Sequence, residues 1–236
     1  MRALLLPIKD LTNAKKRLTG VLTPMERFGL AQAMLADTMR AVRSVCRADK
    51  IFVVTNYQPA IRLAAESGWE ILPEERQISE SDSVDAASRI CEASGVHAVL
   101  RVPLDLPLVQ PGDIDDLLAL EFESPAMVIV PSRDGTGTNA ILRTPPTLFP
   151  SHFGDGSFLK HLAEADRTGA RVMVRRNARL EMDVDDESDL RVLLEHDLGE
   201  TETARWLELS GVAARFRSNT EAPGKMAART WRMGAS

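Results

Sequence analysis

Basic side chains gather directly after the first apolar stretch of the chain. Lys9, Lys15 and Arg17 lie within nine residues of one another, with Lys16 beside them. Such a turn suits a polyphosphate, because Lys and Arg donate charge-assisted hydrogen bonds to phosphate oxygens and a helix N-terminus also favours an anion. The chain contains neither a GxGxxG nor a GxxxxGK[ST] sequence, so the turn is not a dinucleotide fingerprint or a Walker A loop. Taken alone, the cluster is better explained as an ordinary solvated turn.

Acidic side chains stand at two further points. Asp105 follows an apolar run directly and is flanked by prolines that restrict the backbone. Asp183 and Asp185 are expected at the end of another strand, where alternate residues of an extended chain share one face. Because Mg²⁺ is usually bound by one or two carboxylates together with substrate phosphates, Asp105 and Asp183 are candidate metal ligands. Asp186 is better explained as the N-cap of a following helix.

Two loops rich in small residues could supply backbone donors. They are segments 132–139 and 153–157. Glycine lets backbone N–H groups approach an anion closely, and a helix beginning at Ser157 would add its dipole. The hydroxyls of Thr138 and Ser157 can donate as well. The alternative for each loop is a pair of tight turns, the usual reason for a glycine cluster.

The elements that must position these residues alternate along the chain. Apolar, β-branched runs predict strands, and three- and four-residue apolar spacing predicts helices. The strands are expected at 3–7, 51–54, 69–72, 98–102, 127–130, 140–143 and 171–174. The helices are expected from 24 and near 112, and at 59–67, 83–93, 157–168 and 186–196. This order predicts an α/β fold with a mostly parallel twisted sheet flanked by helices, whose ligands lie beyond the carboxyl ends of the strands.

Composition excludes several classes of protein. The chain has 236 residues, of which 44% are hydrophobic and 5% aromatic, and its net charge is −5. Neither the electrostatics nor the base-stacking surface of a general nucleic-acid binder is expected. The apolar runs are too short for a membrane span or a signal peptide, and Cys46 and Cys91 form no CxxC pattern. A cytoplasmic protein without a membrane partner is therefore predicted. If the chain assembles, a homodimer is expected, because dimers are the commonest soluble oligomers.

The chain is expected to divide near its end. Residues 1–198 would form one catalytic domain, and 199–236 a C-terminal helix with a partly disordered basic tail. From Arg215 to Arg232 this tail holds five basic residues against the single acid Glu221. An interface segment is the other interpretation, and a polyanion site the less favoured one.

The motifs, taken in their order, resemble the phospholactate/phosphoenolpyruvate guanylyltransferases of coenzyme F420 biosynthesis. The resemblance covers about residues 1–197 and rests on Pro7-Ile8-Lys9, 14–18, Asp105-Leu106-Pro107, 135–140, 153–158 and Asp183-Val184-Asp185. It implies a nucleotidyltransferase (GT-A/Rossmann-like) fold. It also implies Mg²⁺-dependent transfer of GMP from GTP to a small phosphorylated three-carbon acid, with release of pyrophosphate.

The resemblance also implies roles for single residues. The acid would be held by Lys9, Thr138, Asn139, Gly154 and Ser157, and the metal by Asp105 and Asp183. The nucleotide would lie against Leu6, Lys15 and Arg17, and the catalytic neutralisation of charge would fall to Lys9, Lys15 and Arg17. A phosphate monoester is mostly dianionic at neutral pH, so no general base is needed and the four histidines are expected to be structural or surface residues.

One position departs from the family pattern. Where the family usually has a Leu-Asn pair at the opening of a helix near the base, this chain has Ser83-Val84-Asp85. The Asp85 carboxylate could accept two hydrogen bonds from guanine, or it could be a solvent-facing acid of a first helical turn.

Other functions remain open at the level of the sequence. One alternative is a related nucleotidyltransferase that acts on a sugar phosphate or a molybdopterin-like acceptor, although these relatives generally carry a glycine-rich first loop. Another is a non-catalytic GTP-binding regulator. The sequence does not choose among 2-phospho-L-lactate, phosphoenolpyruvate and 3-phospho-D-glycerate as the acceptor.

Overall fold

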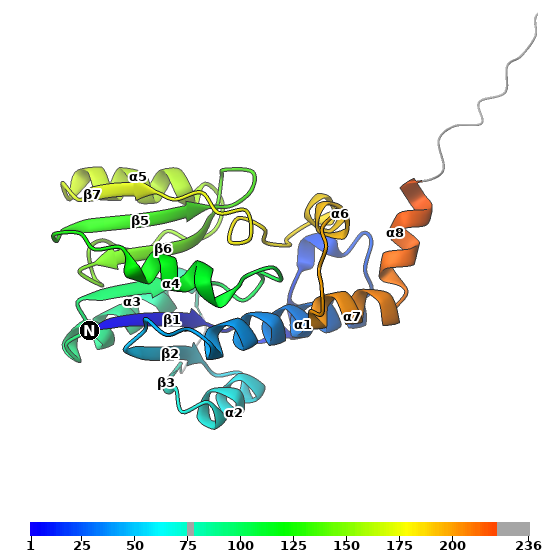
Figure 1. Ribbon diagram of the computed structural model, residues 1–236, viewed down its shortest axis with the longest axis horizontal. Helices are drawn as coiled ribbons and strands as arrows, with labels where there is room; N and C mark the ends of the chain where they lie inside the picture. The colour runs from blue at the N-terminus through cyan, green and yellow to red at the C-terminus, as the bar shows by residue number, and fades with distance from the viewer. Residues whose placement is uncertain (75–77, 221–236) are drawn as a thin grey trace, which may run out of the picture.

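The computed structural model describes residues 1–74 and 78–220 (Figure 1). The strands are β1 (Arg2–Pro7), β2 (Lys50–Thr55), β3 (Glu70–Pro73), β4 (Ala98–Arg101), β5 (Ala126–Pro131), β6 (Thr138–Thr144) and β7 (Arg171–Val174). The α-helices are α1 (Pro24–Arg43), α2 (Gln58–Glu66), α3 (Glu80–Ala93), α4 (Pro111–Ala119), α5 (Ser157–Arg167), α6 (Glu187–Glu195), α7 (Glu202–Leu209) and α8 (Val212–Thr220). Two short 3-10 turns, η1 (Leu11–Asn13) and η2 (Lys16–Leu18), follow β1.

The seven strands form one sheet in the order β3-β2-β1-β4-β6-β5-β7. The pairs β1–β2, β1–β4, β2–β3 and β5–β7 are parallel, whereas β6 runs antiparallel to both β4 and β5. The mostly parallel α/β sheet predicted from the sequence is therefore confirmed. Strand β6 is antiparallel because only residues 132–137 connect it to β5, and a parallel connection needs a dozen or more residues.

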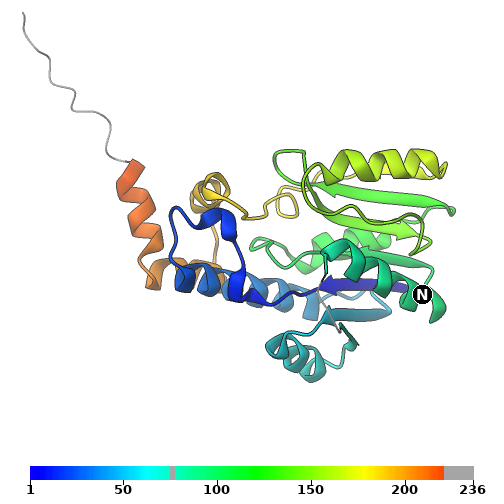
Figure 2. The same cartoon turned by 180° about the vertical axis from the view of Figure 1, so that it is seen from behind.

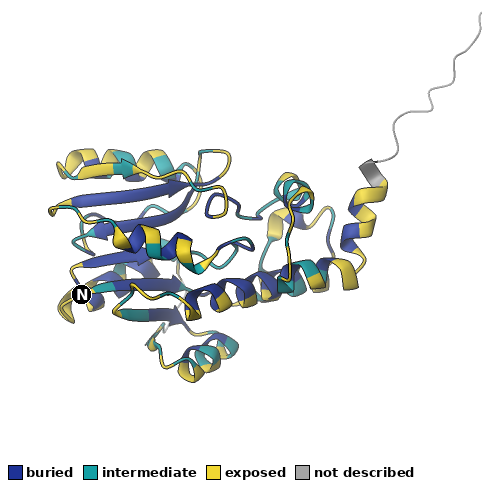
Figure 3. Ribbon diagram, viewed as in Figure 1, coloured by how far each residue is buried: buried dark blue, intermediate teal, exposed yellow. Residues whose placement is uncertain are grey.

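Alternate residues of the strands pack against helices on opposite faces of the sheet. Leu4 and Leu6 of β1 lie in a cluster with Leu35 of α1 and Ile114 of α4, and helix α2 joins the same face. Leu5 of β1 instead packs with α3, and β5 and β6 pack with α5 on that second face. Figure 2 shows α3 and α5 in front of the sheet, and in Figure 3 the strands are mostly buried between the helical layers.

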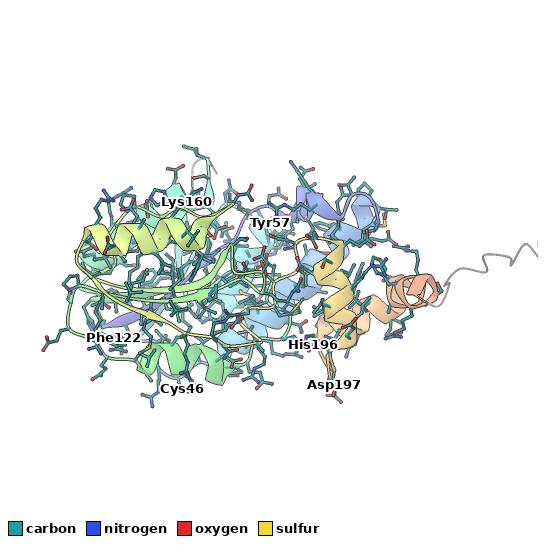
Figure 4. All side chains as sticks on the ribbon, turned by 90° about the horizontal axis from the view of Figure 1, so that it is seen from above. Cys46, Tyr57, Phe122, Lys160, His196 and Asp197 are labelled. Atoms are coloured by element: carbon teal, nitrogen blue, oxygen red, sulfur yellow. The ribbon has the colours of Figure 1, made fainter. Side chains whose placement is uncertain are left out.

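The side-chain view confirms the two layers. Figure 4 shows Lys160 of α5 on one side of the sheet and Phe122 and Cys46, beside α4, on the other. Within the described part of the chain, no helix is both long and apolar enough to cross a membrane.

A second core lies beyond the end of the sheet. Helix α1 begins at a capping box, in which the Thr23 side chain accepts from the Glu26 backbone and Glu26 bonds back to the Thr23 backbone. The N-terminal half of α1 packs with η2, α6, α7 and α8 in a separate apolar cluster that includes Leu30, Leu193 and Leu207. The segment after Gly199 thus contributes two helices to this core, while 221–236 lie outside the described residues.

One expected strand end is absent. Strand β7 stops at Val174, and Asp183–Asp185 belong to irregular chain between β7 and α6. The cause is local turn chemistry: the Asn177 side chain accepts from the Arg179 backbone N–H, and Glu181 accepts from the Asn177 backbone N–H. Such side-chain bonds compete with strand pairing. The prediction of a strand end for these acids is therefore wrong.

Candidate active site

Two hollows adjoin at the carboxyl edge of the sheet. The β6 hollow, about 430 Å³, is lined by the start of β6, the start of α5 and segment 132–137. The β1 hollow, about 460 Å³, is lined by residues 7–17 and by α1. The side chains common to both hollows are Arg17, Glu80, Arg101, Pro103, Asp105 and Asp185. The loops after β1 and β4 therefore meet where the sheet topology predicts a ligand site.

Lys15 is a buried cation of the β1 hollow that reaches the junction through its carboxylate partners. Its Nζ lies 2.7 Å from Asp105 Oδ2 and 3.0 Å from Asp185 Oδ1, and its side chain is only 9% exposed. Burial opposes its charge, but attraction by Asp105 and Asp185 outweighs burial and raises the pKa of Lys15. Burial likewise opposes ionisation of Asp105, and Lys15 nevertheless holds the pKa of that carboxyl below its ordinary value. Both groups are thus charged at neutral pH.

Arg17 supplies a further cation, which is exposed enough to meet a ligand. Its side chain is 62% exposed, and its Nη2 donates to Asp155 Oδ1 at 2.7 Å. Its Nη1 lies 4.0 Å from Asp185 Oδ2. Since an exposed ion pair contributes little to stability, this guanidinium can exchange its carboxylate for a phosphate at low cost.

Asp183 adds a further carboxylate to this site. Asp183 Oδ1 accepts from Asn139 Nδ2 at 3.1 Å, and the side chain lines the β6 hollow. Burial, reinforced by the charges of Asp105 and Asp185, raises the pKa of the Asp183 carboxyl to about 7. Oxygen donors that repel one another in this way suit a hard divalent cation.

Asp105 and Asp183 offer too few oxygen ligands to hold a metal ion by themselves. Across residues 1–74 and 78–220, no group of three or more His, Cys, Asp or Glu side chains is arranged as a metal site. A cation held by Asp105 and Asp183 would therefore need oxygens of a substrate, which is the usual arrangement for Mg²⁺.

The two glycine-rich loops, segments 132–139 and 153–157, form one wall of the β6 hollow. The Phe158 backbone N–H donates to Thr136 O at 3.1 Å and so ties the loops together. Gly154 has a φ of 104°, and Gly156, the N-cap of α5, has a φ of 68°. Both values lie in the region that favours glycine. The start of α5 is thereby turned so that Ser157 lines the hollow beside Thr138.

The structure brings most of the expected site residues together. Lys15, Arg17, Asp105, Thr138, Asn139, Gly154, Ser157 and Asp183 all line the paired hollows. Lys9 lies on the β1 hollow, apart from the other residues expected to hold the acid. Leu6 is fully buried in the core, and its neighbour Pro7 lines the β1 hollow instead.

Asp85 is the residue that the structure sets apart. Helix α3 begins at Glu80 instead of Ser83, so Asp85 falls in the second turn and lines neither of the two hollows. Its carboxylate accepts from the Ser151 backbone N–H at 3.0 Å and lies 3.6 Å from Arg143 Nη1. The expected first-turn position is therefore wrong, and the acid anchors the loop before α5.

Sequence reasoning missed Arg101 and Glu80. Arg101 ends β4, pairs with Glu80 and donates to the carbonyls of Thr138 and Asn139 at 3.2 and 3.1 Å. Its guanidinium stacks on Phe153, 4.3 Å from the ring centroid. The available signal was an arginine at the carboxyl end of an otherwise apolar strand.

Comparison with known proteins gives concordant matches. A family model described as "Guanylyl transferase CofC like" matches residues 1–226. A phosphoenolpyruvate guanylyltransferase of Rubrobacter xylanophilus is 36% identical over 188 residues, which cover 78% of this chain and 89% of that protein. A 2-phospho-L-lactate guanylyltransferase of Methanothermobacter thermautotrophicus is 32% identical over 195 residues, covering 83% and 85%.

Solved structures share the fold. One, described as a nucleotide-diphospho-sugar transferase from Desulfovibrio desulfuricans G20, superposes with a TM-score of 0.73 at 15% identity and covers 91% of this chain and 96% of that one. A nucleotidyl transferase from Methanothermobacter thermautotrophicus has a TM-score of 0.56 at 14% identity, covering 89% and 99%. At such identities the likeness concerns the fold alone.

Proposed function

The chain belongs to the CofC-like guanylyl transferase family, and from this premise we propose that it transfers GMP from GTP to a small phosphorylated three-carbon acid, in coenzyme F420 biosynthesis. The observation that carries the proposal is the junction of two hollows at Asp105 and Arg17, where Lys15 pairs with Asp105. Two substrates bound in adjoining hollows would present their phosphates to each other at this junction.

The linings suit two different ligands. The β1 hollow combines Lys9, Lys15 and Lys16 with apolar Leu11 and Met34, a mixture suited to a nucleoside triphosphate. The β6 hollow offers hydroxyl and amide groups and the start of α5, namely Thr138, Asn139, Gly154 and Ser157, which suit a phosphate and a carboxylate on a small acid.

The reaction needs positioning and charge neutralisation. A phosphate oxygen of the acid attacks the α-phosphorus of GTP, a new P–O–P linkage forms, and the bond to the β-phosphate oxygen breaks so that pyrophosphate leaves with the electron pair. Two anions approach each other, so the barrier is largely electrostatic. Lys15 and Arg17 lower it by pairing with phosphate oxygens, and the dianionic acceptor needs no base.

Asp105 and Asp183 are the residues we assign to a divalent cation, taken as Mg²⁺. Their oxygen donors and the raised pKa of Asp183 fit such an ion. When bound, Mg²⁺ would supply positive charge that offsets the phosphates of both substrates. Lys15, which pairs with both Asp105 and Asp185, keeps the Asp105 carboxylate in place.

Pyrophosphate release tests the proposal. The purified protein receives Mg²⁺ and GTP with 2-phospho-L-lactate, phosphoenolpyruvate or 3-phospho-D-glycerate in turn, and CTP and ATP replace GTP as controls. Release that requires GTP and one acid supports the proposal and identifies the acceptor. Binding of GTP without release, with any of the acids, would contradict it and favour a sugar-phosphate acceptor or a regulatory role.

A further inference from the structure

His161 is a fully buried histidine next to the β6 hollow. It lies one turn into α5 from Ser157 and has 0% exposure. Its ring packs edge-on against Phe153, with centroids 5.1 Å apart, and beside Phe149 at 6.0 Å. These contacts fix the ring plane, so each ring nitrogen faces one defined partner.

The hydrogen bonds of His161 determine its tautomer. The backbone N–H of His152 donates to His161 Nε2 at 2.9 Å. A backbone N–H can only donate, so Nε2 must be the unprotonated, accepting nitrogen. Burial first, and then the charge of Arg143, lowers the pKa of His161 to about 3, so the ring is neutral at physiological pH. The proton of the neutral ring is therefore on Nδ1.

This tautomer sets the direction of the Thr138 hydroxyl. His161 Nδ1 lies 3.0 Å from Thr138 Oγ1, so Nδ1 donates and Oγ1 accepts. The hydroxyl proton then has to point away from His161. Within residues 1–74 and 78–220 the hydroxyl has no other hydrogen-bond partner, and Thr138 lines the β6 hollow. The proton is therefore offered to whatever occupies that hollow.

We infer that His161 is a positioning residue that makes the Thr138 hydroxyl an obligatory hydrogen-bond donor to the acidic acceptor substrate. The inference rests on the proposed function, which places that acid in the β6 hollow. A phosphate or carboxylate oxygen satisfies the donor, whereas a neutral ligand with a donor at the same position would leave two protons facing each other.

The tautomer can be measured without turnover. In ¹⁵N-labelled full-length protein, the His161 ring should show a protonated Nδ1 and an unprotonated Nε2, unchanged between pH 5 and 8. A protonated Nε2 would overturn the inference.

Kinetics test the consequence for the substrate. His161→Phe keeps the ring shape and removes both hydrogen bonds, so we expect the KM for the acid to rise roughly 10- to 100-fold with the KM for GTP unchanged. His161→Gln, which retains one donor and one acceptor, should recover most of the loss. In a Thr138→Val background, His161→Phe should have little further effect on the KM for the acid.

A matched control separates positioning from packing. His152→Ala leaves the backbone N–H that bonds His161 and removes a ring 6.1 Å from it, so the KM for the acid should stay near wild type. Additive effects of His161→Phe and Thr138→Val, or an equal rise in the KM for GTP, would reduce His161 to a packing residue. If no phospho-acid supports turnover, the proposed function fails and the assignment to an acid fails with it. The His161 tautomer would then still show that the Thr138 hydroxyl donates its proton away from His161.

Discussion

A lysine held between two carboxylates sets the charge of the junction. Lys15 adopts a left-handed backbone conformation, with a φ of 54°, which is uncommon for a residue with a side chain. Such strain persists where surrounding contacts over-determine it, and here Asp105 and Asp185 both hold the Lys15 ammonium. Asp105, which we assign to the metal ion, and Asp185 therefore also fix the turn after β1.

At this junction, Asp105→Asn should abolish most turnover and preserve the fold. The amide has the shape of the carboxylate and can still accept from Lys15, but it lacks the charge needed for a cation. We expect kcat to fall by about 10²–10³-fold or more while the melting temperature stays near wild type. Steady-state pyrophosphate release and thermal unfolding measure the two effects. Asp166→Asn, an exposed acid on α5, is the control, and near wild-type turnover in Asp105→Asn would remove Asp105 from the mechanism.

The stability of the ligand-free protein should depend on pH through Asp183. Burial, with the charges of Asp105 and Asp185, raises the pKa of this carboxyl from 3.8 to about 7. Between these two values the folded state binds more protons than the unfolded state, so the unfolding free energy falls as pH rises from about 4 to about 7. Below about pH 4, Asp183 is protonated in both states and does not change the unfolding free energy. Above about pH 7 it is ionised in both states, and the folded protein bears the full cost of the buried charge.

Asp183→Asn isolates that contribution. The variant should match the wild type near pH 4 and be more stable than the wild type above pH 7, when both are unfolded with urea in the presence of a chelator. Addition of Mg²⁺ and GTP should stabilise the wild type more than the variant, and this difference should shrink below pH 7, where Asp183 takes up a proton. Parallel pH curves for the two proteins would show that Asp183 carries no such shift.

Among the elements, the start of α5 depends most on glycine. Gly154→Ala places a side chain at a φ of 104°, which costs about 1–3 kcal/mol or forces the loop to move. We expect lower stability and a higher KM for the acid, because Ser157 shifts with the loop. Gly169→Ala is the matched control: its φ is 67°, it lies at the other end of α5, and a Cβ there meets open space. This control should lose about 1 kcal/mol of stability with the KM unchanged. An equal rise of the KM for the acid in both variants would contradict the placement of the acid against segment 153–157.

The order of elements explains which site residues could be predicted. Lys15 and Asp105 directly follow β1 and β4, so the alternation of strands and helices was enough to place them at one edge. Asp85 was misplaced because the N-terminus of α3 lies three residues earlier, a shift of about 4–5 Å along the helix axis. Ser79, whose side chain accepts from the Asp82 backbone N–H, is a cap that could have located it. The place of Arg101 at the end of β4 could be predicted, but its partners could not, because they come from β6 and α3, which are distant in the sequence.

At the scale of the whole molecule, the second core joins the end of the chain to the first helix. Asp37 of α1 accepts from the backbone N–H groups of Glu202 and Thr203 at 2.8 Å each, and so caps α7. Arg215 of α8 donates to Glu26 at 2.8 Å, near the capping box of α1. The helices after Gly199 therefore pack on the same helix whose other half covers the sheet, and we propose that they unfold together with it.

Gly29→Ala tests this cooperation, because a side chain at residue 29 of α1 would meet the indole of Trp206 on α7. A Cβ on residue 29 would lie 2.4 Å from the Trp206 Nε1. Alanine inside a helix is favoured over glycine by about 1 kcal/mol, but overpacking costs about 1–3 kcal/mol, so the clash should win and lower the melting temperature.

The sign should reverse once the indole is removed. In a Trp206→Ala background, Gly29→Ala should raise the melting temperature, because only helix propensity remains. Calorimetry measures both changes, and a single transition in all four proteins would show that α7 and the sheet unfold as one unit. A stabilising Gly29→Ala in the wild-type background would mean that α7 does not rest on α1 in solution.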